Sequence, residues 1–159
     1  MTTLFTRVPS PVGDVMLAGD VYALSAVWID GQRWAPEIGA DWRESAEPFD
    51  QARRQLTEYF AAARTTFALP LRRAGTPFQR QVWRELERIP YGETRTYGAV
   101  AAAIGRPRAA RAVGAANGQN PFCIIVPCHR LVGAGGGLVD YAAGVPVKRW
   151  LLDHEAAGR

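Results

Sequence analysis

The segment 124-IIVPCHRLVG-133 places the residues with the clearest chemistry of this 159-residue chain side by side. Cys128 follows a run of apolar residues and a proline, and His129 comes directly after it. A thiol is a weak nucleophile at neutral pH unless a base or a positive environment favours the thiolate. Neighbouring side chains on extended backbone point opposite ways, so these two can cooperate only across a sharp turn or through a bridging water. The segment supports two hypotheses: a thiolate nucleophile with its base, or a buried cysteine beside a hydrogen-bonded histidine.

A second pair of reactive side chains, His154 and Glu155, lies near the end of the chain. Glu155 is a candidate to orient His129 and to stabilise its positive charge, which would complete a relay of nucleophile, base and orienter. His154 is the alternative base. Cys123 lies inside the apolar run and is expected to pack in the core. Two cysteines and two histidines at these spacings fit no common zinc site, so we expect no metal.

Residues 1–75 are expected to form a small structural α/β domain. Apolar, β-branched and aromatic residues bounded by Pro, Gly and Asp over residues 3–29 predict a meander of antiparallel strands. Apolar residues at helical spacing predict a helix over 48–62, and a short strand is predicted over 65–70. The segment 70–76 combines proline, charge and glycine, and it marks the predicted boundary.

Residues 76–159 are expected to form a mainly helical second domain. Thr76 as N-cap and Pro77 at the first helical position predict a helix over 77–89. Further elements follow in the order helix 97–104, capped by Thr94 or Thr96, helix 107–117, apolar strand 122–126, glycine-rich loop and helix 146–155. The helices on either side of the tight Gly-Arg-Pro turn have the proportions of a winged-helix-like helix-turn-helix, although alanine-rich helical hairpins also occur in ordinary cores. The predicted fold class is α+β.

The charge of the chain is divided unevenly between these two parts. Residues 1–75 carry eight Arg against nine Asp and Glu, a net charge of −1, whereas residues 76–159 carry eleven Arg and Lys against six Asp and Glu, a net charge of +5. A basic C-terminal half favours an anionic partner, with a merely solvated basic face as the alternative.

The C-terminal half resembles one family closely. The run 117-NGQNPFCIIVPCHRLVGAGG-136, with 144-GVPVKRWLLDHE-155 after it, is similar to the O6-alkylguanine-DNA alkyltransferases, the methylated-DNA–protein-cysteine methyltransferases. The likeness extends upstream through 76–117, while residues 1–75 fit only loosely as the variable N-terminal domain of that family. Some members bind zinc there through Cys and His ligands, but residues 1–75 of this chain contain neither residue type.

The resemblance implies a single-turnover methyltransferase that needs no cofactor. Cys128 would accept an alkyl group irreversibly from O6 of a damaged guanine in double-stranded DNA, and O4-alkylthymine is a second conceivable substrate. His129, through a water, would take the thiol proton, and Glu155 would steady the imidazolium. Asn120, eight residues before the cysteine, would brace the active-site turn.

The resemblance also implies DNA contacts, because the target base must be flipped out of the stack before it reacts. Arg111 would fill the vacated space, and Tyr97 would help to turn the nucleotide and donate to the base. Small residues would let the helix after the turn approach the minor groove: Ala109, Ala110, Gly114 and Ala115.

The pocket contacts that the resemblance implies include departures from the family pattern. Tyr141 matches the tyrosine of the pocket wall, and the Leu131 carbonyl would accept from the guanine amino group. Ala142 replaces a serine of the family, Val139 stands where Gly or Thr is common, and Asp140 adds an acid near the DNA. We therefore predict a tighter pocket that favours methyl over benzyl adducts.

Three other functions fit these residues less well. Non-catalytic alkyltransferase-like proteins lack the reactive cysteine, a thiol hydrolase would leave the basic helices unused, and a DNA-binding regulator would need a dimerisation element. The chain has no signal-peptide character and no apolar run of membrane-spanning length, so we expect a cytoplasmic protein without membrane association. It is expected to be a monomer, with cooperative DNA binding left open.

Overall fold

The chain begins with a strand meander whose central strand is completely buried. The computed structural model describes residues 2–158, and in it β1 (Leu4–Val8), β2 (Val15–Gly19) and β3 (Leu24–Ile29) pair antiparallel. A short strand, β4 (Arg43–Glu44), adds to β1 in parallel, which gives the sheet order β3-β2-β1-β4. The predicted meander over residues 3–29 is therefore confirmed, with a register irregularity at Ala18/Gly19.

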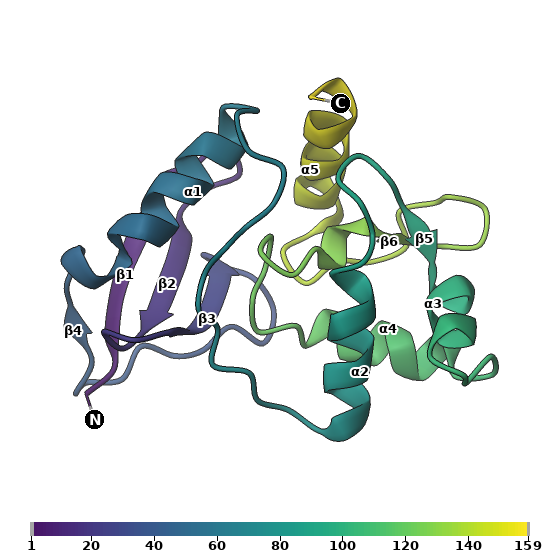
Figure 1. The fold of residues 1–159 in the computed structure, drawn as a ribbon, viewed down its shortest axis with the longest axis horizontal. Helices are drawn as coiled ribbons and strands as arrows, with labels where there is room; N and C mark the ends of the chain where they lie inside the picture. The colour runs from purple at the N-terminus through teal and green to yellow at the C-terminus, as the bar shows by residue number, and fades with distance from the viewer. Residues whose placement is uncertain (1, 159) are drawn as a thin grey trace. The chain divides into compact units, whose positions relative to one another are not determined.

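One face of this sheet is covered by α1 (Asp50–Phe60), which follows a 3-10 turn, η1 (Glu47–Phe49) (Figure 1). The helix buries Ala52, Leu56 and Tyr59, as its apolar spacing predicts. The other face carries a cluster of Met16, Ala18 and Trp28, and Trp42 from the following loop packs edge-on against Trp28. Each face of the sheet is thus buried by a different segment of the first half.

The strand predicted over residues 65–70 does not form. Gln55 of α1 takes the place of a neighbouring strand: its amide donates to the Ala68 carbonyl at 3.1 Å and accepts from the Ala68 N–H at 2.9 Å. Only Leu71 makes an isolated bridge, to Leu24 of β3. A buried side-chain amide satisfies backbone groups as well as a strand does, and the sequence pattern does not distinguish the two.

The prediction of a strand over residues 122–126 is also wrong. Phe122 makes one isolated bridge to Val27, and the backbone then turns, with Ile124 at a φ of 72°. A β-branched residue in this left-handed region is strained and cannot continue a strand. Backbone packing groups Pro121–Ile125 with residues 1–73, and Ala74–Asn120 with Val126–Arg159, so the chain forms two units.

The second unit begins with three helices that pack on one another: α2 (Pro77–Leu86), α3 (Tyr97–Ala103) and α4 (Ala110–Gly118) (Figure 1). Thr76 caps α2 in a full capping box with Gln79, and Thr96, not Thr94, caps α3. Helix α4 begins three residues later than predicted, because residues 107–109 form a turn. The Trp83 indole on α2 donates to the Ala116 carbonyl on α4 at 2.8 Å, which fixes these two helices to each other.

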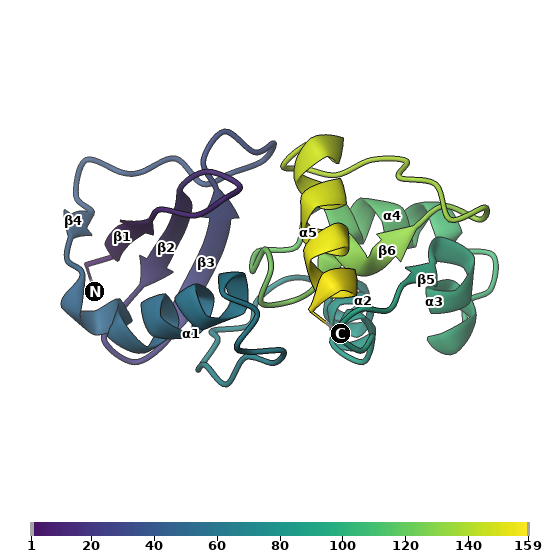
Figure 2. The ribbon, with the colours of Figure 1, turned by 90° about the horizontal axis from the view of Figure 1, so that it is seen from above.

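The rest of this unit carries the cysteine turn and the last helix. Two short strands, β5 (Arg95–Thr96) and β6 (Leu131–Val132), pair in parallel. The 3-10 turn η2 (Cys128–Arg130) packs against α5 (Val145–Ala157), which Figure 2 shows end to end in yellow. The fold is therefore mixed α and β, with a helix-turn-helix of α3 and α4 in the second half, as predicted. Among residues 2–158 no helix is long and apolar enough to cross a bilayer.

Candidate active site

Cys128 lies at the start of a tight turn with its side chain buried. The turn begins where the Cys128 N–H donates to the Val126 carbonyl at 2.7 Å, and the Leu131 N–H closes it onto the Cys128 carbonyl. The side chain is 5% exposed, and its Sγ lies 3.6 Å from the Tyr141 hydroxyl, within hydrogen-bond reach for sulfur. The turn supplies the sharp change of direction that a cooperating Cys-His pair requires.

His129 is held by Glu155 of α5. His129 Nε2 and Glu155 Oε2 are 2.7 Å apart, and both side chains are fully buried. A carboxylate can only accept, so Nε2 carries the proton and Nδ1 keeps its lone pair in the neutral ring. Among residues 2–158 no group hydrogen-bonds to Nδ1. Nδ1 is therefore the atom of this ring that can take a proton.

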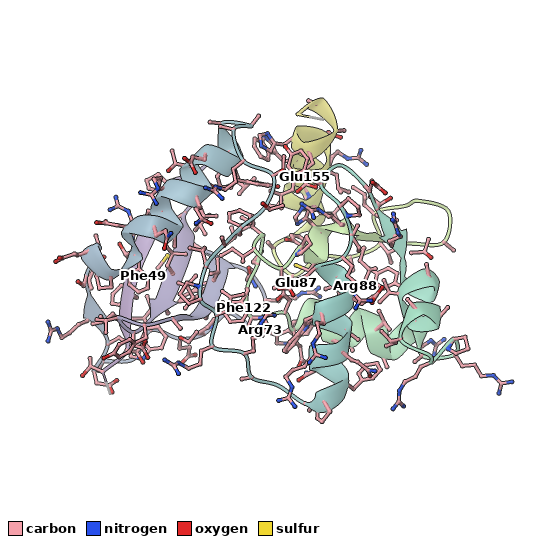
Figure 3. The ribbon with its side chains drawn as sticks, viewed as in Figure 1. Phe49, Arg73, Glu87, Arg88, Phe122 and Glu155 are labelled. Atoms are coloured by element: carbon pink, nitrogen blue, oxygen red, sulfur yellow. The ribbon has the colours of Figure 1, made fainter. Side chains whose placement is uncertain are left out.

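Glu155 is also paired with Arg130, a residue to which the sequence analysis gave no role. Arg130 donates from Nε to Oε1 at 2.8 Å and from Nη2 to Oε2 at 3.0 Å, while its Nη1 donates to the Ile89 carbonyl at 2.7 Å. The Gly92 N–H adds a longer bond of 3.3 Å to Oε1. Figure 3 labels Glu155 on α5. A bidentate, charge-assisted pair of this kind fixes the plane of the carboxylate that orients His129.

The groups that donate to Glu155 lower the pKa of its carboxyl more than burial raises it. Burial alone would raise its pKa, but the hydrogen bonds and positive charges of His129 and Arg130 hold the pKa of Glu155 far below its usual range. The carboxylate is therefore ionised throughout the physiological pH range, and it favours a positive charge on His129 whenever that ring takes a proton.

Two asparagines fasten the turn from the side of α4. Asn120 donates to the Val126 carbonyl at 2.8 Å. Asn117, which the sequence analysis did not single out, donates to the Cys128 carbonyl at 3.3 Å. Both side chains are 6% exposed. The end of α4 thus holds the backbone just before the cysteine and at the cysteine itself.

Lys148 is the third residue that the sequence analysis left without a role, although it is the one lysine of the chain. Its side chain is fully buried, a rare state for lysine, and Nζ donates to the Asp140 carbonyl at 3.1 Å. The Nζ atom also lies 6.0 Å from the ring centroid of Tyr141. Burial lowers the pKa of Lys148, whereas the negative charges of Cys128 and Asp140 act to raise it. Lys148 therefore holds the segment that carries Tyr141, and its amino group interacts electrostatically with Cys128.

Tyr97 stands at the junction of α3 and α4. Its ring would be 3.5 Å from a Cβ added at Gly114, so it packs on the glycine of α4. Burial raises the pKa of Tyr97, with smaller contributions from the charges of Asp140 and Cys128. The hydroxyl therefore keeps its proton at neutral pH and remains a donor. Arg111 is exposed on α4.

The small residues predicted for α4 differ in exposure. Ala115 is exposed, and Ala109, Ala110 and Gly114 are partly buried, with Ala109 as the residue just before the helix. The start of α4 and its partly exposed side therefore carry no bulky side chain at these four positions.

The residues predicted for the substrate pocket fall into two groups. Leu131 and Tyr141 are buried and Ala142 is partly buried. Val139 is 68% exposed, and its Cγ2 would lie 2.6 Å from a Cβ added at Gly133. Val139 therefore covers the glycine-rich loop, and it is not part of a buried wall.

The alternative base is occupied elsewhere. The His154 ring stacks on Trp150 of the same helix, with ring centroids 4.8 Å apart and an interplanar angle of 17°. His129, and not His154, is the histidine bonded to Glu155. Cys123 is buried next to β3, where its N–H donates to the Val27 carbonyl at 2.9 Å.

Both halves of the chain match profiles of one known family. Residues 77–157, which contain all the candidate site residues above, match the family profile "6-O-methylguanine DNA methyltransferase, DNA binding domain". Residues 3–73 match the "ribonuclease-like domain" of the same family. The chain belongs to the 6-O-methylguanine DNA methyltransferase family.

Several relatives in this family match nearly the whole chain. A methylated-DNA–protein-cysteine methyltransferase of Methanosarcina acetivorans is 48% identical over 93% of this chain and 95% of its own. The constitutive methylated-DNA–protein-cysteine methyltransferase of Bacillus subtilis is 41% identical over 95% of this chain and 94% of its own. The solved structure of Mycobacterium tuberculosis OGT in complex with DNA has a TM-score of 0.92 and 44% identity, and the match covers 98% of this chain and 94% of that one.

Proposed function

We propose that this protein repairs DNA by transferring an alkyl group from O6-alkylguanine to its own Cys128. The observation that carries the proposal is the buried Cys128 turn, whose neighbour His129 is bonded to Glu155, in a chain of this family. The Cys128 thiolate attacks the saturated carbon on O6, so that a sulfur–carbon bond forms and the carbon–oxygen bond breaks. The guanine leaves with the electron pair and takes up one proton, which balances the proton that the thiol gives up, so the base is restored and the protein is consumed.

The proton of the thiol passes through a water to Nδ1 of His129. Glu155 stabilises the imidazolium, because its carboxylate is already ionised and 2.7 Å from Nε2. Arg130 fixes that carboxylate, and Lys148 adds a positive charge that favours the thiolate. A soft, strongly nucleophilic thiolate suits displacement at carbon.

Double-stranded DNA that carries the damaged guanine is the proposed partner. Helix α4 approaches the minor groove, Arg111 fills the space of the flipped nucleotide, and Tyr97 donates to the extruded base. The exposure of Arg111, the small residues of α4 and the positive charge of residues 76–159 support this placement. The pocket then closes on the base with Leu131, Tyr141 and Ala142, and flipping costs a few kcal/mol.

The two halves of the chain are proposed to differ in role. Residues 76–159 bind DNA and accept the alkyl group, whereas residues 1–75 are structural. The family matches over 3–73 and 77–157 support a division near this point. We propose a cytoplasmic monomer.

A mass measurement on the intact protein tests this function. After incubation with duplex DNA containing O6-methylguanine, the protein should gain the mass of one methyl group, and Cys128→Ala should gain none. Cys123→Ala is the matched control, because Cys123 is also buried but should not be alkylated. Absence of the gain in the unaltered protein, transfer beyond one equivalent, or a gain that depends on Cys123 would refute the proposal.

A further inference from the structure

Asn117 is buried between the DNA-binding helix and the nucleophile. It lies in the last turns of α4, six positions after Arg111, and only 6% of it is exposed. Only the amino group of an amide can donate to a carbonyl, so Nδ2 faces the Cys128 carbonyl, 3.3 Å away. This carbonyl belongs to the peptide that joins the nucleophile to His129, and its other bond comes from the Leu131 N–H.

The oxygen of the Asn117 amide, Oδ1, has no hydrogen-bond partner among residues 2–158. Nor does any group in this range bond to His129 Nδ1. Both atoms are buried acceptors that belong to side chains at the Cys128–His129 peptide. Buried polar atoms without partners are rare, and a buried water usually makes about three hydrogen bonds. A water that donates to both of these acceptors keeps a lone pair that can accept the Cys128 thiol proton.

We infer that Asn117 is a positioning residue for the alkyl transfer: its amino group fixes the peptide between Cys128 and His129, and its oxygen holds the water that relays the proton between them. The inference deepens the proposed function and rests on it. Both roles require the amide, and neither requires contact with DNA. Asn117 therefore acts on the chemical step and not on the affinity for the duplex.

Two substitutions separate this role from a structural one. Asn117→Leu keeps the branched shape of the side chain, removes both polar atoms and excludes a water. Asn117→Ala also removes the amide but leaves space that a water can occupy. If Asn117 only filled space, the protein would tolerate the shape-matched Leu better than Ala. If Asn117 holds the relay water, we expect the opposite order for the rate of methyl transfer, with the larger loss in Asn117→Leu.

The measurement is single-turnover methyl transfer from duplex DNA over a range of DNA concentrations. In Asn117→Leu we expect the saturating rate to fall about tenfold, as for loss of one or two hydrogen bonds in the reacting complex. The DNA concentration at half-saturation should stay within about twofold of that of the unaltered protein. In Asn117→Ala the saturating rate should fall less, although thermal unfolding should show Ala to be the less stable of the two.

Gln119→Leu is the matched control. Gln119 lies two residues further on, is exposed, and accepts a hydrogen bond from Gln79 of α2. Its saturating rate should equal that of the unaltered protein.

The possible failures are distinct. If the unaltered protein gains no methyl group, the proposed function fails and the inference with it. If the unaltered protein is methylated, the inference alone is overturned by an unchanged saturating rate in Asn117→Leu. The inference would also be overturned if Asn117→Ala lost more of the saturating rate than Asn117→Leu, in line with its lower stability. A change in the half-saturating DNA concentration with no change in the saturating rate would overturn it as well.

Discussion

Replacing Glu155 by Gln is the sharpest test of how the site is built. The substitution keeps the shape of the side chain but removes the charge that Arg130 and His129 both contact. Arg130 is 7% exposed and would be left as a buried cation without its counter-ion. Removing one partner of a buried ion pair costs about 3–5 kcal/mol. For a chain of 159 residues that unfolds as one unit, we expect the unfolding midpoint to fall by roughly 6–20 °C.

The same substitution should change the response to acid, and the sign follows from the depressed pKa of Glu155. Its ordinary value is 4.5, and in the folded protein the value is much lower. The carboxylate therefore contributes its full stability above the unfolded value, and this contribution is lost as the pH falls towards the folded value. The loss is about 1.4 kcal/mol per pH unit. The difference in unfolding free energy between the two proteins should thus narrow by about 2 kcal/mol between pH 5 and pH 3.

Urea unfolding at pH 7, 5 and 3 measures both effects. The double variant with Arg130→Met should recover part of the lost stability, because no unpaired cation then remains buried. The reasoning would be refuted if the free energy of unfolding of Glu155→Gln lay within about 1 kcal/mol of that of the unaltered protein. It would also be refuted if the difference between the two free energies did not change as the pH falls.

Three further predictions concern the chemistry and the DNA contacts. Arg111→Ala should slow repair of duplex DNA far more than reaction with the free alkylated base, because only the duplex needs flipping; equal losses would contradict the role of Arg111. Lys148→Met removes the bond to the Asp140 carbonyl and a buried charge that favours the Cys128 thiolate. Alkylation of Cys128 by iodoacetamide at neutral pH should therefore slow about tenfold, and an unchanged rate would show that Lys148 is structural. The unaltered protein should react faster with methyl- than with benzyl-guanine; equal rates with both adducts would exclude the tighter pocket.

Local signals in the sequence were sufficient for many helix ends. The Thr76-Pro77 start of α2 follows from a side chain that satisfies a backbone N–H group within a few residues. The cap of α3 was narrowed to Thr94 or Thr96 by the same reasoning, and the structure shows Thr96. The strands predicted over 65–70 and 122–126 failed for the opposite reason. Their apolar composition reports burial alone, whereas pairing depended on the Gln55 amide and on the positive φ of Ile124.

The buried polar residues show the same limit at the site. Arg130, Lys148 and Asn117 carry no signal in hydrophobic periodicity, because charged and amide side chains are usually solvated. Their partners are distant along the chain: Arg130 bonds to Glu155 over 25 positions, and Asn117 to Cys128 over 11. The one clue was that Lys148 is the only lysine among arginines.

The sequence by itself determined the reagents of this protein: a thiol beside an imidazole, a carboxylate in the last helix, and a basic helix-turn-helix before them. These depend on residue type and short spacing, which the sequence states directly. Only the tertiary structure decided which histidine meets Glu155, since His129 and His154 are both candidates and packing leaves His154 on Trp150. It also decided that Arg130, Lys148 and Asn117 belong to the site. Hydrogen bonds between residues far apart in the chain exist only once the core has brought them together and excluded water.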